Sequence, residues 1–196
     1  MRRTEASYAR RGPSREPYAS VLIVCEGGKS EPNYLFGLVS TYRLSSANIR
    51  ITPADGTDPV SVVKYAQELY VEGKYDRVYC VFDRDEHPNY DEALQLIARL
   101  ANFFAITSWP CFEIWILLHF IYSAAPRDRN GALAEVLKYY GKYTKDCRTC
   151  FGDLKSRLDD ALHHARRLEG ENRKTGSTNP STKMHNLVEY LIRLKA

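Results

Sequence analysis

Short apolar runs separated by polar segments dominate the first 110 residues. The first run, Ala19–Cys25, has no polar alternation, which is typical of a strand buried on both faces of a parallel sheet. Similar runs predict further strands over Asn48–Thr52, Arg77–Phe82 and Phe103–Thr107.

Helical patterns lie between these predicted strands. One helix begins at Ser30 or Glu31, with Pro32 behind it, and continues to about Tyr42. A second begins at Asp58-Pro59, where apolar residues then recur with the 3.6-residue period. Two more are predicted over Asn89–Leu100 and Cys111–Tyr122. Because strands and helices alternate with short connections, we expect an α/β fold: a three-layer α/β/α arrangement with a parallel sheet of about four strands.

After Pro126 the strand signals stop and the pattern is helical. Helices are predicted over Gly131–Tyr140, Phe151–Leu168 and Thr182–Leu194, and the polar stretch Glu169–Ser181 is interpreted as a long mobile loop. We therefore divide the chain into a basic flexible arm (1–18), an α/β core (19–125) and a helical extension packed on that core (126–196).

Composition narrows the class of protein. The chain has 196 residues, of which 44% are hydrophobic, so it can bury a sizeable core. No apolar stretch approaches the ~20 residues that a membrane span needs, and the N-terminus lacks the apolar segment of a secretory signal. Five scattered cysteines are typical of reduced thiols. We expect a cytoplasmic protein with no membrane contact.

The net charge of +4 hides three segments of different sign. Residues 1–20 carry five basic and two acidic side chains, residues 21–146 carry 13 and 16, and residues 147–196 carry ten and six. An acidic centre with basic ends suits a site that holds a cation, flanked by surfaces that meet a polyanion, although a chance distribution of solvated charge gives the same counts.

Acidic side chains follow two of the predicted strands. Glu26 follows the first strand, and Asp83 and Asp85 follow the third. Residues two apart in an extended segment point the same way, and functional sites of open α/β sheets lie at the carboxyl ends of the strands. If the two strands are neighbours, the three carboxylates converge, and hard oxygen ligands of this kind suit Mg²⁺ or Mn²⁺. The alternative is that the two aspartates only cap the next helix.

Four segments carry a family resemblance: VLIVCEGGKSEPNY, VYCVFDRDEHPN, SWPCFEIWILLHF and NPSTKMHNLVEYL. Together, over roughly Ser20–Leu191, they resemble the RloB-like family, whose catalytic part is similar to a Toprim domain. Two positions depart from the family's usual pattern, since Gly28 replaces a Glu and Trp109 replaces an Asn before Pro-Cys-Phe-Glu.

The resemblance implies a function. In Toprim proteins, a Glu after the first strand and a DxD after the third bind a divalent metal for breaking or joining nucleic acids. That pattern falls on Glu26, Asp83 and Asp85, with residues 19–125 as the Toprim-like core. Glu113 lies within the resemblance and could assist as a fourth ligand or a general base, or only favour the N-terminus of its helix. The implied role is bacterial defence against phage or foreign nucleic acid, beside an ABC-type or AAA-type ATPase partner.

Basic side chains supply the expected contacts to DNA or RNA. Gly28-Lys29-Ser30 is similar to the end of a phosphate loop, but Ile23 stands where that loop needs a Gly, so we expect no ATP site. Lys29 could contact a phosphate near a helix N-terminus or be solvated. The remaining candidates surround the predicted loop or lie in the arm: Arg166, Arg167, Arg173, Lys174, Lys183, Arg2, Arg3, Arg10, Arg11 and Arg15.

Histidines and cysteines offer weaker signals. Cys147 and Cys150 precede His163 and His164 at spacings that suggest zinc, but the fourth ligand is missing at normal spacing, which favours an unliganded pair. His119 lies about 600° around the helix from Glu113 and is interpreted as a packing residue. His87 could contact substrate, but a lone loop histidine more often has no role.

Two functions remain. The leading hypothesis is a Mg²⁺-dependent Toprim-type nuclease in which a metal clamp positions the scissile phosphate. The alternative is a non-catalytic nucleic-acid-binding or regulatory module whose acids bind metal only structurally.

Overall fold

The computed structural model describes residues 19–194 except 46–47, 57 and 85–86. Strands and helices alternate through the first half: β1 (Val21–Cys25), α1 (Ser30–Tyr42), β2 (Ile49–Pro53), α2 (Pro59–Glu72), β3 (Arg77–Asp83), α3 (Tyr90–Ala98) and β4 (Phe103–Trp109). The second half is mainly helical: α4 (Glu113–Leu118), α5 (Arg129–Tyr139), α6 (Cys150–Leu154), the 3₁₀ turn η1 (Lys155–Arg157), α7 (Leu158–Thr175), β5 (Ser181–Thr182) and α8 (Met184–Arg193). The basic arm 1–18 and its arginines lie outside the described residues.

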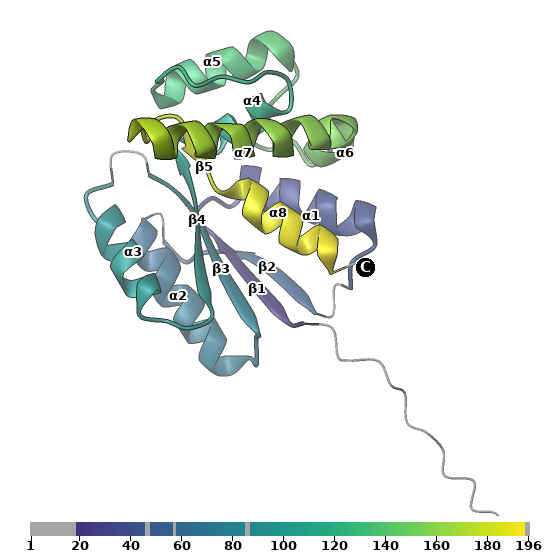
Figure 1. Cartoon of the computed structure of the whole chain (residues 1–196). Coiled ribbons are helices and arrows are strands. Elements are labelled where there is room, and N and C mark those ends of the chain that lie inside the picture. Colours follow the sequence, from purple (N-terminus) through teal and green to yellow (C-terminus); the bar gives the residue numbers. More distant parts are fainter. Residues whose placement is uncertain (1–18, 46–47, 57, 85–86, 195–196) are drawn as a thin grey trace, which may run out of the picture.

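The strands form one sheet in the order β2-β1-β3-β4-β5. The first four are parallel, as the pattern predicts, and β5 is a two-residue strand antiparallel to β4. Helices cover both faces of this sheet (Figure 1). The predicted α/β class is confirmed, and the arrangement is consistent with a Toprim-like fold.

Each face of the sheet has its own apolar core. Val21, Ile23 and Cys25 of β1 pack in a cluster with α1 and the C-terminal helices, whereas Leu22 and Val24 pack with α2 and α3. All five side chains are fully buried, so the unbroken apolar run of β1 reflects burial on both faces.

The C-terminal part is built into the fold. The helix α8 lies beside α1 over one face of the sheet, and α4 to α7 gather beyond the carboxyl ends of the strands (Figure 1). Leu187, Val188 and Leu191 of α8 are completely buried in the same core as β1. The strand β5 adds an edge to the sheet through Thr182, whose Oγ1 lies 3.0 Å from Ser108 Oγ.

The long loop predicted over Glu169–Ser181 begins later than expected, because α7 continues to Thr175 and ends at Gly176. The apolar row of α7 stops at Leu168, after which polar residues make contacts that favour helix. Arg167 pairs with Glu171 and Arg173 with Glu169, both at the i,i+4 spacing that stabilises exposed helices. Apolar periodicity alone therefore underestimates the length of this helix.

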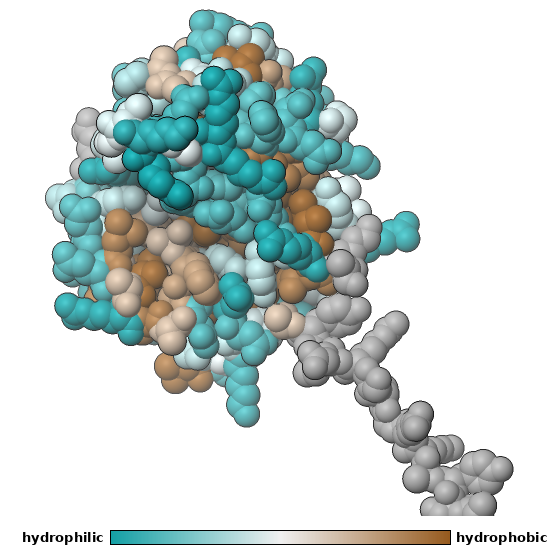
Figure 2. All heavy atoms as spheres, in the orientation of Figure 1, coloured by the Kyte–Doolittle hydropathy of each residue, from teal (hydrophilic) through white to brown (hydrophobic). Residues whose placement is uncertain are grey.

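The surface over the C-terminal half is strongly polar. Figure 2 shows strongly hydrophilic side chains gathered over the part of the molecule where Figure 1 places α7. Among the described residues, no helix combines the length and apolarity that crossing a lipid bilayer requires.

Candidate metal centre and nucleic-acid interface

Two acids meet where β1 and β3 leave the sheet. Glu26 follows β1 directly, and Asp83 is the last residue of β3, which pairs with β1 in parallel. The Asp83 backbone N–H donates to Glu26 Oε2 at 3.0 Å. The two strands are therefore neighbours, as the metal-site hypothesis requires. Asp85, the third predicted ligand, lies outside the described residues.

A cavity of about 230 Å³ opens above these two acids. The helices α1 and α4 each add a buried carboxylate to its wall, from Glu31 and Glu113. Three cations also line it: Lys29, Arg129 and Lys145. Four acids therefore face three cations in one small space, a charge pattern typical of functional sites rather than of packed cores.

Asp83 is a buried acid with a perturbed pKa. Its side chain is 11% exposed, and burial raises the pKa of its carboxyl well above the usual range, helped by the negative charge of Glu31. Arg129, at the start of α5, opposes this shift, since its Nη2 lies 3.3 Å from Asp83 Oδ2. One arginine from a helix 46 residues away therefore offsets part of the cost of the buried charge.

Glu31 is the acid that sequence reasoning missed. Burial, with further contributions from the charges of Glu113 and Glu26, raises the pKa of Glu31 to about 7. A methyl group on Gly27 would lie 2.7 Å from Glu31 Oε2, so glycine leaves the space that this carboxylate occupies. The sequence does place Glu31 in the first turn of the helix that follows Glu26. An acid at that position is also a common feature of helix starts, so it did not by itself indicate a site.

Glu113 begins α4 and is buried, with 3% of the residue exposed. The Tyr143 hydroxyl donates a hydrogen bond to Glu113 Oε1 at 3.1 Å. This bond fixes the direction of the carboxylate inside the cavity. Glu113 lines the same cavity as Glu26 and Asp83.

His87 contacts the same site. Its Nε2 lies 3.1 Å from Glu26 Oε1, and the ring is about one quarter exposed. Nothing in the sequence indicates that His87 pairs with Glu26.

The donor set fits a hard divalent cation. Carboxylate oxygens are the ligands that Mg²⁺ and Mn²⁺ prefer. Burial is the main cause of the raised pKa of Asp83 and the charge of Glu31 adds to it, so a cation beside Asp83 would stabilise the ionised carboxylate. In the described part of the chain, no three His, Cys, Asp or Glu side chains are close enough together to hold a metal as they stand. Glu26 is engaged by His87 and Asp83 by Arg129, so a metal would replace these contacts.

The described residues among the predicted basic candidates are mostly paired with acids. On α7, Arg166 pairs with Glu189, and the Arg167 guanidinium lies 3.8 Å from the centroid of the Tyr122 ring. Arg173 and Lys183 both pair with Glu169, while Lys29 pairs with Asp146 at 2.8 Å with both side chains well exposed. Lys174 is exposed near the end of α7. Exposed pairs of this kind are weak, so these cations stay available to an anion.

The remaining candidates have structural partners. Cys150 is buried, and Cys147 Sγ lies 3.6 Å from the Tyr140 hydroxyl, while His164 Nδ1 contacts the Leu118 carbonyl at 2.8 Å. His119 is fully buried against Tyr34, and burial lowers the pKa of its ring to about 4. The interpretation of His119 as a packing residue is confirmed.

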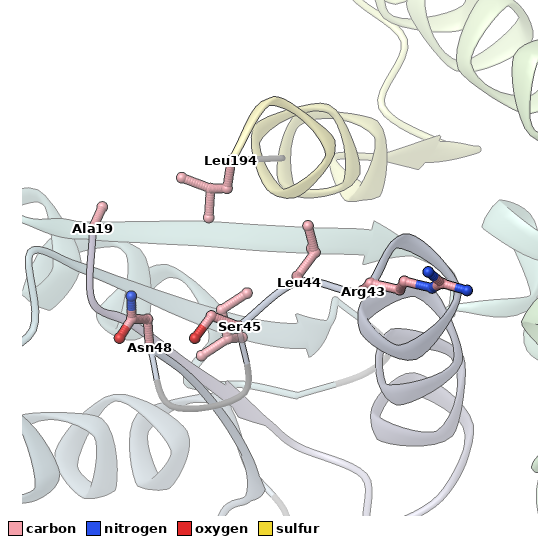
Figure 3. Close-up of a pocket in the computed structure, with 7 residues that line it drawn as sticks. Ala19, Arg43, Leu44, Ser45, Asn48 and Leu194 are labelled. Carbon is pink, nitrogen blue, oxygen red and sulfur yellow. The ribbon is translucent and has the colours of Figure 1, made fainter. Parts of the chain in front are cut away.

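A second cavity, of about 190 Å³, lies at the opposite end of the sheet beside the end of α8 (Figure 3). Among the described residues that line it, Arg43 alone is charged, and none is acidic. It lacks the carboxylates that distinguish the first cavity.

Comparison with protein-family models matches residues 21–191 to the RloB-like protein family. The match covers most of the chain and confirms the resemblance found in the sequence. No curated protein and no solved structure matches the chain.

Proposed function

The chain belongs to the RloB-like protein family, and on this premise we propose that it is a Mg²⁺- or Mn²⁺-dependent nuclease of the Toprim type that acts in defence against foreign nucleic acid. The observation that carries the proposal is the convergence of Glu26 and Asp83 at neighbouring strand ends, in one cavity with Glu31 and Glu113.

Within this proposal, Glu26 and Asp83 hold the cation, joined by Asp85. When bound, the cation would position the scissile phosphate, neutralise developing charge and lower the pKa of an attacking water. Arg129 then leaves Asp83 and contacts a phosphate oxygen, which its planar fork suits. Glu31, whose pKa is about 7, can accept or return a proton near neutral pH. Glu113 is held by Tyr143 and orients water or metal.

A specific observation supports a second function. Glu26 and Asp83 already have protein partners in His87 and Arg129, so the acids can be part of a stable structure without metal. The chain would then be a nucleic-acid-binding or regulatory module. Metal-dependent cleavage separates the two functions.

An ATPase partner is part of the proposal. Family membership supports a defence-associated role, and Ile23 of β1 stands where a phosphate loop ending in Gly28-Lys29-Ser30 would need a glycine. ATP-driven steps would therefore be performed by another chain, of ABC or AAA type.

Purified protein incubated with supercoiled DNA, single-stranded DNA and tRNA tests the proposed activity. We expect cleavage of at least one substrate with Mg²⁺ or Mn²⁺ and none after addition of EDTA, because the carboxylates act through the cation. The Glu26→Gln variant should be inactive under the same conditions. Intact substrates in every reaction would favour the binding module.

Metal should also stabilise the protein. A cation that binds only the native state at 100 times its dissociation constant adds about 2.7 kcal/mol, which for a domain of this size raises the melting temperature by roughly 5–10 °C. The measurement is thermal unfolding with and without Mn²⁺. The exposed Glu68 on α2 provides a control, since Glu68→Gln should keep the full shift, whereas Glu26→Gln should lose most of it. An equal shift in both variants would place the cation elsewhere.

A further inference from the structure

The indole ring of Trp109 borders two recesses beside the acid cavity. Trp109 is the last residue of β4, and Asp83 pairs in register with the residue before it, Ser108. One recess, of about 330 Å³, lies towards α7, and the other, of about 300 Å³, lies towards the start of α5. Both volumes are at the lower end of the range of small-ligand sites.

Arg84 and Tyr90 extend this aromatic surface. The Arg84 guanidinium lies 3.6 Å from the centroid of the Trp109 ring and 5.2 Å from that of Tyr90. Arg84 follows Asp83 directly, and its backbone N–H donates to the Ser108 carbonyl at 2.8 Å. The strand ladder therefore holds the stacked Arg84–Trp109 pair one residue away from the acid site.

Shared lining residues connect the acid cavity and the two recesses into one continuous path. Arg129 lines both the acid cavity and the recess near α5, and Trp109 lines both recesses. Acids outnumber cations among the residues that line the acid cavity, whereas among the described residues that line the recess near α7 three cations, Arg84, Arg173 and Lys183, face one acid, Glu169. A nucleic-acid strand that extends from the acid cavity would thus contact Arg129 first, then the Trp109 ring, and then the cations of the recess near α7.

We propose that Trp109, which Arg84 covers on one side of its ring, is a stacking platform for an unpaired base on the other side, and that the path from Arg129 to Arg173 binds single-stranded nucleic acid next to the acid site. This inference rests on the proposed function for its position, but the platform binds a strand whether or not the strand is cut. Base stacking on an aromatic ring requires a base with a free face, which a paired and stacked duplex does not offer. The occupant is therefore a single strand or an unpaired loop.

Intrinsic fluorescence reports on this site directly. The chain has two tryptophans, and Trp115 is completely buried in the core, so a stacked base can reach Trp109 alone. In EDTA, where no cleavage occurs, we expect quenching on titration with a 12-nucleotide oligo-dT or oligo-U. A duplex of the same length, and an abasic oligomer that keeps the phosphates, should bind with little quenching. Unequal affinity for the two oligonucleotides identifies DNA or RNA as the better ligand.

Variants separate stacking from charge. Trp109→Ala should weaken binding of the oligonucleotides about 5- to 150-fold, the effect of losing one stacked base, and leave the abasic oligomer unaffected. Trp109→Phe should restore most of the affinity. Phe36→Ala removes an exposed aromatic elsewhere, on α1, and should change nothing.

Each outcome decides the inference. If Trp109→Ala loses affinity equally for normal and abasic oligomers, or if the wild-type protein shows no quenching, the proposed stacking role of Trp109 is wrong even if the protein cuts nucleic acid. Quenching and selective loss in Trp109→Ala support it even if no substrate is cut, in which case the nuclease proposal alone fails. Binding of none of the probes overturns both.

Discussion

Replacing Asp83 by Asn is expected to lower metal-dependent cleavage by about 100-fold or more, because the amide keeps the shape of the side chain but loses the charge that binds the cation. The same change should not destabilise the protein. Burial and Glu31 raise the pKa of Asp83, so at neutral pH its ionised form costs free energy in the fold that the amide does not. The measurements are the cleavage rate and the melting temperature, both compared with wild type.

A matched control is available on α3, where Asp91 is exposed. Asp91→Asn should leave cleavage and melting temperature unchanged. If Asp83→Asn were to cut at the wild-type rate, Asp83 would not be a metal ligand. A large fall in its melting temperature without metal would instead mean that the ion pair with Arg129 is a main stabilising contact.

Much of the sheet could be predicted from the sequence, since short-range patterns such as apolar runs and helix caps specify its strands and the helices between them. The unbroken apolar run of β1 requires burial on both faces, and the predicted α2 start at Asp58-Pro59 is correct because the Asp58 carboxylate accepts hydrogen bonds from Val60 and Ser61. The two-residue strand β5 has no such signal. It forms only because the chain after α7 returns to β4, where Thr182 pairs with Ser108.

The candidate site was predictable only in part, because some of its residues are placed by long-range contacts. Glu26 and Asp83 end strands, and the rule that functional residues gather at carboxyl strand ends was enough to bring them together. Arg129 and Tyr143 reach the site from the helical half, 46 and 30 residues from the acids that they contact. No periodicity in the sequence specifies such long-range contacts, which depend on how α4 and α5 pack beyond the sheet.

The basic surface of α7 leads to a second large expected effect, on the salt dependence of binding. Arg166 and Arg173 are seven residues apart, as are Arg167 and Lys174, so the four form two rows along the helix. Three of them pair with glutamates, but a phosphate chain can displace such exposed pairs and release its own counterions. We expect log affinity to fall with log salt by about 0.7 to 0.9 for each phosphate contact.

Replacing the four residues by Ala should flatten this slope and weaken binding at low salt by on the order of 100-fold, equally for all sequences. The measurement is a salt titration of oligonucleotide binding. A control with the same change in net charge replaces cations outside the proposed path, Arg50, Lys64, Lys74 and Arg99. If both variants shift the slope equally, only the overall charge attracts the polyanion. If neither does, the cations of α7 face another partner, such as the ATPase, and the phosphate chain is held by Arg84, Arg129 and Lys183 instead.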